Sequence, residues 1–325
     1  MFKRLIVAVA GASLALTALS ACGDSGGSGS GSASGKLVLG FSQVGAESGW
    51  RTANTKSIQD AAKTAGVDLK FSDAQQKQEN QIAAIRSFIK QKVDVIAFSP
   101  VVVTGWDAVL KEAKAADIPV VLTDRAVDSD PSLYVTFLGS DFVEEGKKAG
   151  DWLVNEYKDA KEPVNIVQLE GTVGAAPAID RKKGFEQAIA ANPNLKVIAS
   201  QSGDFTRAKG KEVMQALLKA HKDIDVLFAH NDDMGLGAMQ AIQEAGLTPG
   251  KDIKIVTIDA VKDGMQALAD GKFNFIVECS PLLGDQLMQT AKKVKDGEKV
   301  QKRIVTVETV FDQAKAKEAL PTRKY

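Results

Sequence analysis

Charged, amide and aromatic side chains follow several predicted strands of this 325-residue chain, at the points where those strands end. The first apolar run, 37–42, is followed by Glu47, Trp50 and Arg51. Similar residues recur further along the chain as Asp124, Arg125, Arg181, Asn231 and Asp259. An indole face can stack on the C–H groups of a sugar ring, while carboxylates, amides and guanidinium groups bind its hydroxyls in pairs. These residue types therefore suit a sugar.

Two of these residues occupy matching places in a duplicated pattern. The stretch 93–124 runs from strand through helix to a strand that ends in Asp124, and the stretch 224–259 does the same and ends in Asp259. In open α/β sheets, ligands bind just outside the carboxyl ends of the strands. Two similar lobes facing each other would direct both carboxylates into one cleft. Each Asp could instead cap a turn or the next helix, but the paired placement favours the cleft.

Three other candidates also have ordinary structural roles open to them. Trp50 could belong to a core, and Arg51 or Arg181 could lie on a solvated helix face. If they share a cleft, neighbouring guanidinium and carboxylate groups satisfy each other in the empty site, which limits the cost of desolvating them.

Alternating strands and helices must position these side chains. In the first half, apolar runs predict strands over 37–42, 67–71, 93–98 and 119–122, with helices over 52–65, 78–91 and 105–116. The second half predicts helices over 141–157, 178–191, 207–220 and 234–245, with strands over 164–169, 195–199, 225–229 and 253–258. This alternation is typical of parallel crossovers, so we expect an α/β fold with two doubly wound lobes.

Composition excludes several functional classes. The 41 basic and 41 acidic residues balance, and no local basic patch is found, so we expect no nucleic-acid partner. Two Cys and two His cannot build a disulfide framework or a usual zinc site, so we expect no metal. The sequence also lacks a phosphate-binding loop, because Phe205 stands five residues before Gly210-Lys211. We therefore expect no cofactor, and any ATP hydrolysis must occur on another chain.

The N-terminal segment has the pattern of an export signal. Lys3 and Arg4 precede an apolar run that is too short and too rich in alanine for a spanning helix and ends in Leu19-Ser20-Ala21-Cys22. This tetrapeptide resembles the bacterial lipobox, which implies a signal peptide over 1–21 and a lipid on Cys22. A signal peptide with an incidental Cys is the alternative. The mature chain would carry 39 basic and 41 acidic residues, and its Gly/Ser-rich segment 22–35 would be a flexible tether.

Several longer runs resemble one known family. They include Gly40-Phe41-Ser42-Gln43-Val44-Gly45, Glu47-Ser48-Gly49-Trp50-Arg51, Ile179-Asp180-Arg181-Lys182-Lys183-Gly184-Phe185, Gln201-Ser202-Gly203-Asp204-Phe205-Thr206-Arg207 and Ala229-His230-Asn231-Asp232-Asp233-Met234. Over about 36–320 the chain resembles the galactofuranose-binding proteins of bacterial sugar ABC importers, in the ribose-binding group of type I periplasmic substrate-binding proteins. The resemblance implies two Rossmann-like lobes, joined by a three-stranded hinge, that close on one monosaccharide.

The resemblance also implies a set of contacts and a domain map. Carried over by position, the contacts are Glu47, Trp50, Arg51, Asp124 and Arg125 from the first lobe, and Arg181, Asn231 and Asp259 from the second. A polar side chain just before Pro281, either Glu278 or Ser280, is expected to add a weaker contact. The first lobe would comprise 36–139 plus 282–308, and the second 140–281 plus 309–325, with hinges near Gly139-Ser140, Pro281 and about Thr309.

The resulting hypothesis is a monomeric, exported lipoprotein on the outer face of the cytoplasmic membrane, or in the periplasm if an outer membrane exists. It would capture a monosaccharide, most simply galactose in its furanose form, and deliver it to an ABC permease, with the lipid as its only membrane contact. We expect no enzymatic activity, because no nucleophile elbow or catalytic His arrangement is present. A sugar-binding lipoprotein for another monosaccharide, or for a chemoreceptor or sensor kinase, is the alternative. A repressor would need an N-terminal helix-turn-helix, where this chain has a signal and a tether.

Overall fold

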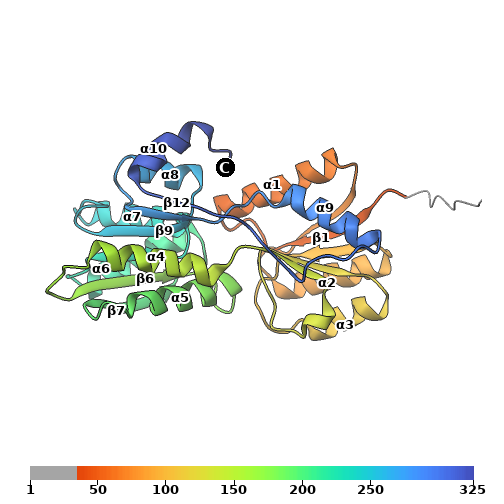
Figure 1. The fold of residues 1–325 in the computed structure, drawn as a ribbon. Coiled ribbons are helices and arrows are strands. Elements are labelled where there is room, and N and C mark those ends of the chain that lie inside the picture. The colour runs from red at the N-terminus through yellow and green to blue at the C-terminus, as the bar shows by residue number, and fades with distance from the viewer. Residues whose placement is uncertain (1–34) are drawn as a thin grey trace, which may run out of the picture. The chain divides into compact units, whose positions relative to one another are not determined.

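Two six-stranded sheets organise residues 35–325, the part of the chain that the computed structural model describes. Each sheet is covered by helices on both faces, and the pair forms two lobes within the single unit Lys36–Tyr325 (Figure 1). The predicted signal peptide, lipidated Cys22 and tether up to residue 34 lie outside the described residues. Within the described residues no helix combines the length and apolar character needed to cross a membrane.

The first sheet has the strand order β11-β5-β4-β3-β1-β2, and all its neighbouring strands are parallel. The elements of this lobe are β1 (Val38–Gln43), α1 (Gly49–Thr64), β2 (Asp68–Asp73), α2 (Gln78–Lys90), β3 (Val95–Phe98), α3 (Asp107–Ala115), β4 (Val120–Thr123), the 3-10 turn η1 (Pro131–Leu133), β5 (Thr136–Gly139), α9 (Gly284–Lys295) and β11 (Arg303–Val305).

The second sheet repeats this plan with the order β12-β10-β9-β8-β6-β7, and only β12 runs antiparallel to its neighbour. Its elements are α4 (Phe142–Glu156), β6 (Val164–Glu170), α5 (Ala176–Ile189), β7 (Leu195–Ser202), α6 (Arg207–Ala220), β8 (Val226–Ala229), α7 (Asp232–Glu244), β9 (Lys254–Asp259), α8 (Lys262–Ala269), β10 (Phe275–Glu278), β12 (Val310–Phe311), α10 (Gln313–Ala319) and the 3-10 turn η2 (Leu320–Thr322). The predicted α/β fold class is confirmed.

Successive residues of the central strands bury their side chains on opposite faces of the sheet. In β3, Ile96 and Phe98 pack into the core beneath α2 and α3, while Val95 and Ala97 pack into the core beneath α1 and α9. In β9, Val256 and Ile258 pack beneath α4 and α5, whereas Ile255 faces α6, α7 and α8. This two-sided burial explains why the strands read as continuous apolar runs in the sequence.

Three connections pass between the lobes. The first leads from β5 through Ser140 into α4, the second from β10 through Pro281 into α9, and the third from β11 through 306–309 into β12. The third connection runs alongside the second, because the Glu278 amide donates to the carbonyl of Thr309. The chain thus returns to the first lobe for one helix and one edge strand before it ends in the second (Figure 1).

Three helices begin earlier than the sequence predicts, and their caps explain the difference. Ser48 accepts a hydrogen bond from the Arg51 amide, so α1 begins at Gly49 rather than at about 52. Asn231 caps α7 in the same way, which moves its start from 234 to 232. A proline at the first turn starts α5 at Ala176 rather than at 178, so Arg181 lies in the second turn.

Candidate functional site

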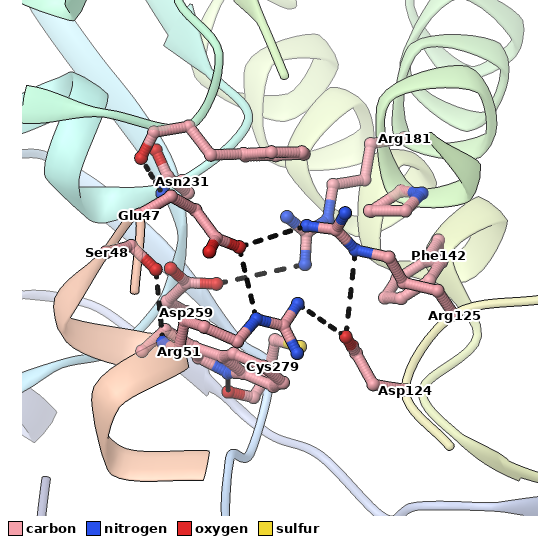
Figure 2. Close-up of a pocket in the computed structure, with 13 residues that line it drawn as sticks. Glu47, Ser48, Arg51, Asp124, Arg125, Phe142, Arg181, Asn231, Asp259 and Cys279 are labelled. Carbon is pink, nitrogen blue, oxygen red and sulfur yellow. Dashed lines mark hydrogen bonds and ion pairs between the residues drawn. The ribbon is translucent and has the colours of Figure 1, made fainter. Parts of the chain in front are cut away.

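A cavity lies between the two lobes, at the carboxyl ends of the central strands (Figure 2). The lobes touch beside it, since the Gly49 amide donates to Asp233 over 2.7 Å and the Val103 amide donates to the Gly174 carbonyl over 2.9 Å. The lining residues are Glu47, Ser48, Trp50, Arg51, Asp124, Arg125, Phe142, Pro177, Arg181, Phe205, Asn231, Asp259 and Cys279.

Arg51 organises the first-lobe wall from the first turn of α1. Its guanidinium lies 2.6 Å from Asp124 Oδ2 and 3.1 Å from Glu47 Oε1. It also donates to Gln43 and Ser99, so four polar groups hold one side chain. The result is a buried guanidinium with a fixed orientation, in place of the solvated helix face that was the alternative for this residue.

Arg125 forms the second cation of the first-lobe wall. Its Nη2 lies 3.3 Å from Glu47 Oε1, and its Nε lies 3.7 Å from Asp124 Oδ2. Its guanidinium carbon is 5.3 Å from the ring centre of Phe205, which belongs to the second lobe. Burial, reinforced by the nearby charge of Arg51, lowers the pKa of Arg125 to about 10. The group stays charged at neutral pH while being nearly removed from water.

Arg181 has the corresponding place in the second-lobe wall. Its Nε lies 2.7 Å from Glu145 Oε2, its Nη1 donates to the His230 carbonyl over 2.6 Å, and its Nη2 lies 3.8 Å from Asp259 Oδ1. The ring of Phe142 packs beneath it, 5.0 Å from the guanidinium carbon. Burial raises the pKa of Asp259 well above its usual value, and Arg181 opposes that shift. Arg181 is therefore a buried wall residue and not a solvated one.

Asp124 and Asp259, the matched pair of the sequence pattern, both leave their strands with a positive φ. The angle is 63° at Asp124 and 126° at Asp259, a region that residues other than glycine rarely adopt. Gly139 makes the first of these geometries possible, because a Cβ there would lie 2.8 Å from the Asp124 carbonyl oxygen. Such conformations persist where the surrounding structure enforces them, often at ligand sites. Both carboxylates reach the same cavity, as the pairing predicts.

Several buried polar atoms of the wall have no hydrogen-bond partner within the described residues. They are Glu47 Oε2, Arg125 Nε and Asp259 Oδ2. A buried polar atom without a partner costs free energy, so a ligand that supplies hydroxyl groups at these points is stabilised. The three atoms comprise two acceptors and one donor, which matches hydroxyls because a hydroxyl can donate and accept.

Trp50 and Asn231 line the cavity and also have structural roles. The Trp50 indole is buried, and its Nε1 donates to the Cys279 carbonyl over 2.7 Å, which links α1 to the second connection. Asn231 caps α7 through its Oδ1 and donates from Nδ2 to the Phe205 carbonyl. Both residues thus combine a structural role with a place in the cavity wall.

Glu278 and Ser280 do not line the cavity, and this part of the expectation needs correction. The Glu278 carboxylate lies 2.8 Å from Arg323 and accepts from the Tyr325 hydroxyl, on the far side of the strand end. The Ser280 hydroxyl accepts from the Leu282 amide within its own turn. Cys279 lies between them and faces the cavity. Alternate residues of an extended segment point to opposite sides, so the residue that reaches the site is the middle one.

The cavity also includes residues that the contacts expected from the sequence did not contain: Ser48, Phe142, Pro177, Phe205 and Cys279. Phe205 has a positive φ of 61° after β7, and its ring lies over Gly171, where a Cβ would come within 1.8 Å of it. Gly171 is the one feature of the sequence that relates to this position of Phe205, because a glycine there leaves room for the aromatic ring. Phe142 and Pro177 occupy first turns of helices, where nothing in the sequence distinguishes them from core residues.

The wall carries three carboxylates and three guanidinium groups, so its formal charges balance. Aromatic rings from both lobes cover the remaining faces. This arrangement fits an uncharged, hydroxyl-rich molecule with C–H faces, because every charge already has a counter-charge. The fold and the site together define a two-lobed binding protein that encloses a small polar ligand.

The comparisons with known proteins identify the family. Residues 39–299, more than half of the chain, match the periplasmic binding protein domain family, so the chain belongs to it. The chain is 50% identical to the galactofuranose-binding protein YtfQ of Escherichia coli K12, over 100% of this chain and 99% of that protein. The predicted family resemblance is thereby confirmed.

Two solved structures agree with this assignment. The crystal structure of a Mycobacterium smegmatis protein in complex with β-D-fucofuranose is 68% identical, has a TM-score of 0.88, and matches over 89% of this chain and 95% of that chain. The crystal structure of a galactofuranose-binding protein is 52% identical, has a TM-score of 0.86, and matches over 89% and 98% of the two chains. The described fold is thus that of the periplasmic binding proteins for sugars.

Proposed function

We propose that this protein captures one monosaccharide of the galactose type, in its furanose form, and delivers it to the membrane permease of an ABC importer. The observation that carries the proposal is the balanced wall, in which three carboxylates and three guanidinium groups line one cavity between the lobes. A neutral sugar can use every one of these groups. A sugar phosphate would bring a charge for which no unpaired cation is provided by the wall.

The ring form follows from the relatives. A galactofuranose-binding protein and the protein crystallised with β-D-fucofuranose share half or more of their residues with this chain over nearly its whole folded length. A five-membered ring is smaller and flatter than a pyranose, which suits a closely bounded cavity. The apolar surfaces of Trp50, Phe142 and Phe205 provide contacts for its C–H faces.

The mechanism is reversible capture without chemistry. In the open form each wall is accessible, and the sugar binds to one wall before the lobes close. Closure brings Arg125 against Phe205 and the Gly49 amide against Asp233. Because these contacts exist only when the lobes meet, a ligand that touches both walls shifts the population to the closed form. The permease then distinguishes the closed from the open surface.

Export and anchoring complete the proposal. The protein acts as a monomer, tethered through a lipid on Cys22, with lobes comprising 36–139 plus 282–308 and 140–281 plus 309–325. Mass spectrometry of membrane-extracted protein tests the anchor, because a diacylglycerol on Cys22 adds a large defined mass that Cys22→Ser removes. Retention of the protein on membranes after that substitution would contradict the lipid anchor.

Isothermal titration calorimetry tests the binding function. We expect D-galactose to bind at one site per chain, and D-galactose 6-phosphate to bind at least a hundredfold more weakly. D-Sorbitol, which has hydroxyls but no ring, serves as the control and should give no heat of binding. Absence of binding for galactose, fucose and arabinose alike would contradict the proposed substrate class.

A further inference from the structure

One glutamate hydrogen-bonds to all three connections between the lobes. Glu308 Oε1, on the third connection, accepts from Ser140 Oγ at 2.5 Å, from the Ser280 amide at 3.0 Å and from Thr306 Oγ1 at 3.1 Å. Ser140 belongs to the first connection and Ser280 to the second. A rotation of the lobes moves these segments relative to one another, so the surroundings of this carboxylate depend on closure.

A second, more deeply buried glutamate lies beside it. The carboxyl oxygens of Glu145 and Glu308 and the sulfur of Cys279 lie within 4.8 Å of one another. Glu145 comes from α4, and its Oε2 accepts from Arg181 Nε at 2.7 Å. Its Oε1 is buried and has no hydrogen-bond partner within the described residues as a carboxylate. Glu145 thus stands between a cavity-lining arginine and the hinge glutamate.

Two carboxylates this close cannot both ionise without strong repulsion when one of them is buried. A proton on Glu145 Oε1 removes that repulsion and gives the unpartnered oxygen a hydrogen bond to Glu308, while Oε2 continues to accept from Arg181. One proton shared by Glu145 and Glu308 therefore relieves the repulsion and provides the missing hydrogen bond.

We propose that Glu145 and Glu308 share one proton in the closed form and act as a positioning pair that couples the hinge to the sugar-binding Arg181. This inference rests on the proposed function. Neither glutamate lines the cavity, and both act through Arg181 and the connections. Closing the lobes takes up a proton, and opening them releases it.

The charged surroundings of the pair agree with this coupling. The ionisable groups that face it from the neighbouring elements are Arg181 on α5, Asp259 at the end of β9, Cys279 after β10 and Arg303 on β11. Burial raises the pKa of Glu145 to about 8, and Glu308 adds to this shift while Arg181 opposes it. Burial also raises the pKa of the Cys279 thiol, so the thiol adds no negative charge near neutral pH.

The sign of the pH effect follows. When the lobes open, Glu145 becomes hydrated and separates from Glu308, so its pKa falls toward the ordinary carboxyl range near 4.5. Between that value and about 8 the closed form holds a proton that the open form lacks. Sugar affinity therefore falls as pH rises through this window, by at most about tenfold per pH unit for one proton.

Calorimetry in two buffers of different ionisation enthalpy measures the proton directly. At pH 7 the wild-type protein should take up a fraction of a proton on binding D-galactose. Glu145→Gln should bind with an affinity within about threefold of wild type, because the amide oxygen accepts from Arg181 and the amide nitrogen donates to Glu308. Its proton uptake should be lower and its affinity should vary less with pH.

The matched control is Glu144→Gln, which changes an exposed neighbour on the same helix and should behave as wild type. Glu308→Gln provides a second variant of the pair and should also lower the proton uptake. Equal proton uptake in wild type, Glu145→Gln and Glu308→Gln would overturn the proposal.

A sugar-free measurement separates this inference from the proposed function. Because the closed form holds a proton on Glu145 that the open form lacks, lowering the pH from 8 to 5 favours closure even without sugar. The radius of gyration of the sugar-free wild-type protein, measured by small-angle X-ray scattering, should therefore decrease from pH 8 to pH 5, whereas that of Glu145→Gln should change little. If no sugar binds, the proposed function fails while this comparison still decides on the shared proton. Parallel pH profiles of the two proteins would contradict it.

Discussion

The guanidinium of Arg125 lies 5.3 Å from the ring centre of Phe205, and the two residues come from opposite lobes. Both line the cavity and both are almost completely buried. This contact forms only when the lobes meet, so it stabilises the closed form and not the open one. Arg125 also pairs with Glu47 (Figure 2), so the contact joins this ion pair to an aromatic ring of the second lobe.

Phe205→Leu should weaken D-galactose binding by about 3- to 30-fold, because a desolvated cation–π contact contributes roughly 0.5–2 kcal/mol. Calorimetry provides the affinity. Phe71→Leu is the matched control, since Phe71 stacks on Phe41 in the first lobe away from the cavity. Unchanged affinity in Phe205→Leu, or an equal loss in both variants, would contradict the role of the contact in closure.

Asp124→Ala should lower the free energy of unfolding by about 3 kcal/mol, because it leaves Arg51 buried without its 2.6 Å partner. Sugar affinity should fall more than a hundredfold, since the carboxylate also orders Arg125. Urea unfolding and calorimetry measure the two effects. Asp60→Ala removes an exposed partner of Lys56 and should cost less than about 1 kcal/mol. Equal losses for the two variants would argue against a buried ionic wall.

Glu278→Gln should leave sugar affinity within about threefold of wild type, because the carboxylate binds Arg323 and Tyr325 outside the cavity. Its thermal stability should decrease slightly, consistent with about 1–2 kcal/mol for one charge-assisted hydrogen bond. Asp259→Asn is the contrasting variant, and it should lose affinity at least tenfold. A large affinity loss in Glu278→Gln would contradict the claim that Glu278 lies outside the sugar-binding site.

His230 should make the protein less stable in mild acid. Burial, with Arg181 and Lys182 adding to it, lowers the pKa of its imidazole well below 6.5. Its contribution to stability is therefore present above the unfolded pKa and is lost as pH falls below about 6.5, by at most roughly 1.4 kcal/mol per pH unit. Urea unfolding of wild type and His230→Gln at pH 7.5 and 5.5 measures the difference. An identical acid loss in both proteins would contradict this prediction.

Cys279 should react with thiol reagents slowly, and bound sugar should slow the reaction by at least tenfold. The thiol is buried in the cavity wall, and burial raises its pKa, so little thiolate is present at neutral pH. In a Cys22→Ser protein, Cys279 is the only thiol, and its labelling can be followed by absorbance. Labelling that sugar does not slow would mean that Cys279 is shielded by something other than lobe closure.

Much of the fold could be predicted because each strand alternates with a helix at regular intervals. The duplicated stretches that end in Asp124 and Asp259 also placed two carboxylates correctly in one cavity. The predicted and observed positions of these two carboxylates agree because the carboxyl ends of parallel strands lie at one edge of each sheet.

The remaining site residues depend on details that a sequence pattern does not contain. Cys279, rather than Glu278 or Ser280, faces the cavity because a shift of one residue in an extended segment exchanges the two sides. Phe205 reaches the cavity through a positive φ at its own backbone and a glycine more than thirty residues earlier. Glu145 depends on tertiary packing alone, since an acidic residue in the first turn of a helix is usually exposed.

The most direct measurement of the central claim compares two ring-locked sugars by calorimetry. Both 1,4-anhydro-D-galactitol and 1,5-anhydro-D-galactitol lack the anomeric hydroxyl, and they differ in having a five- or a six-membered ring. The account predicts that the five-membered compound binds at one site at least tenfold more tightly, and that Asp124→Ala abolishes its binding. Equal binding of the two compounds, or tighter binding of the six-membered one, would contradict a furanose-specific cavity.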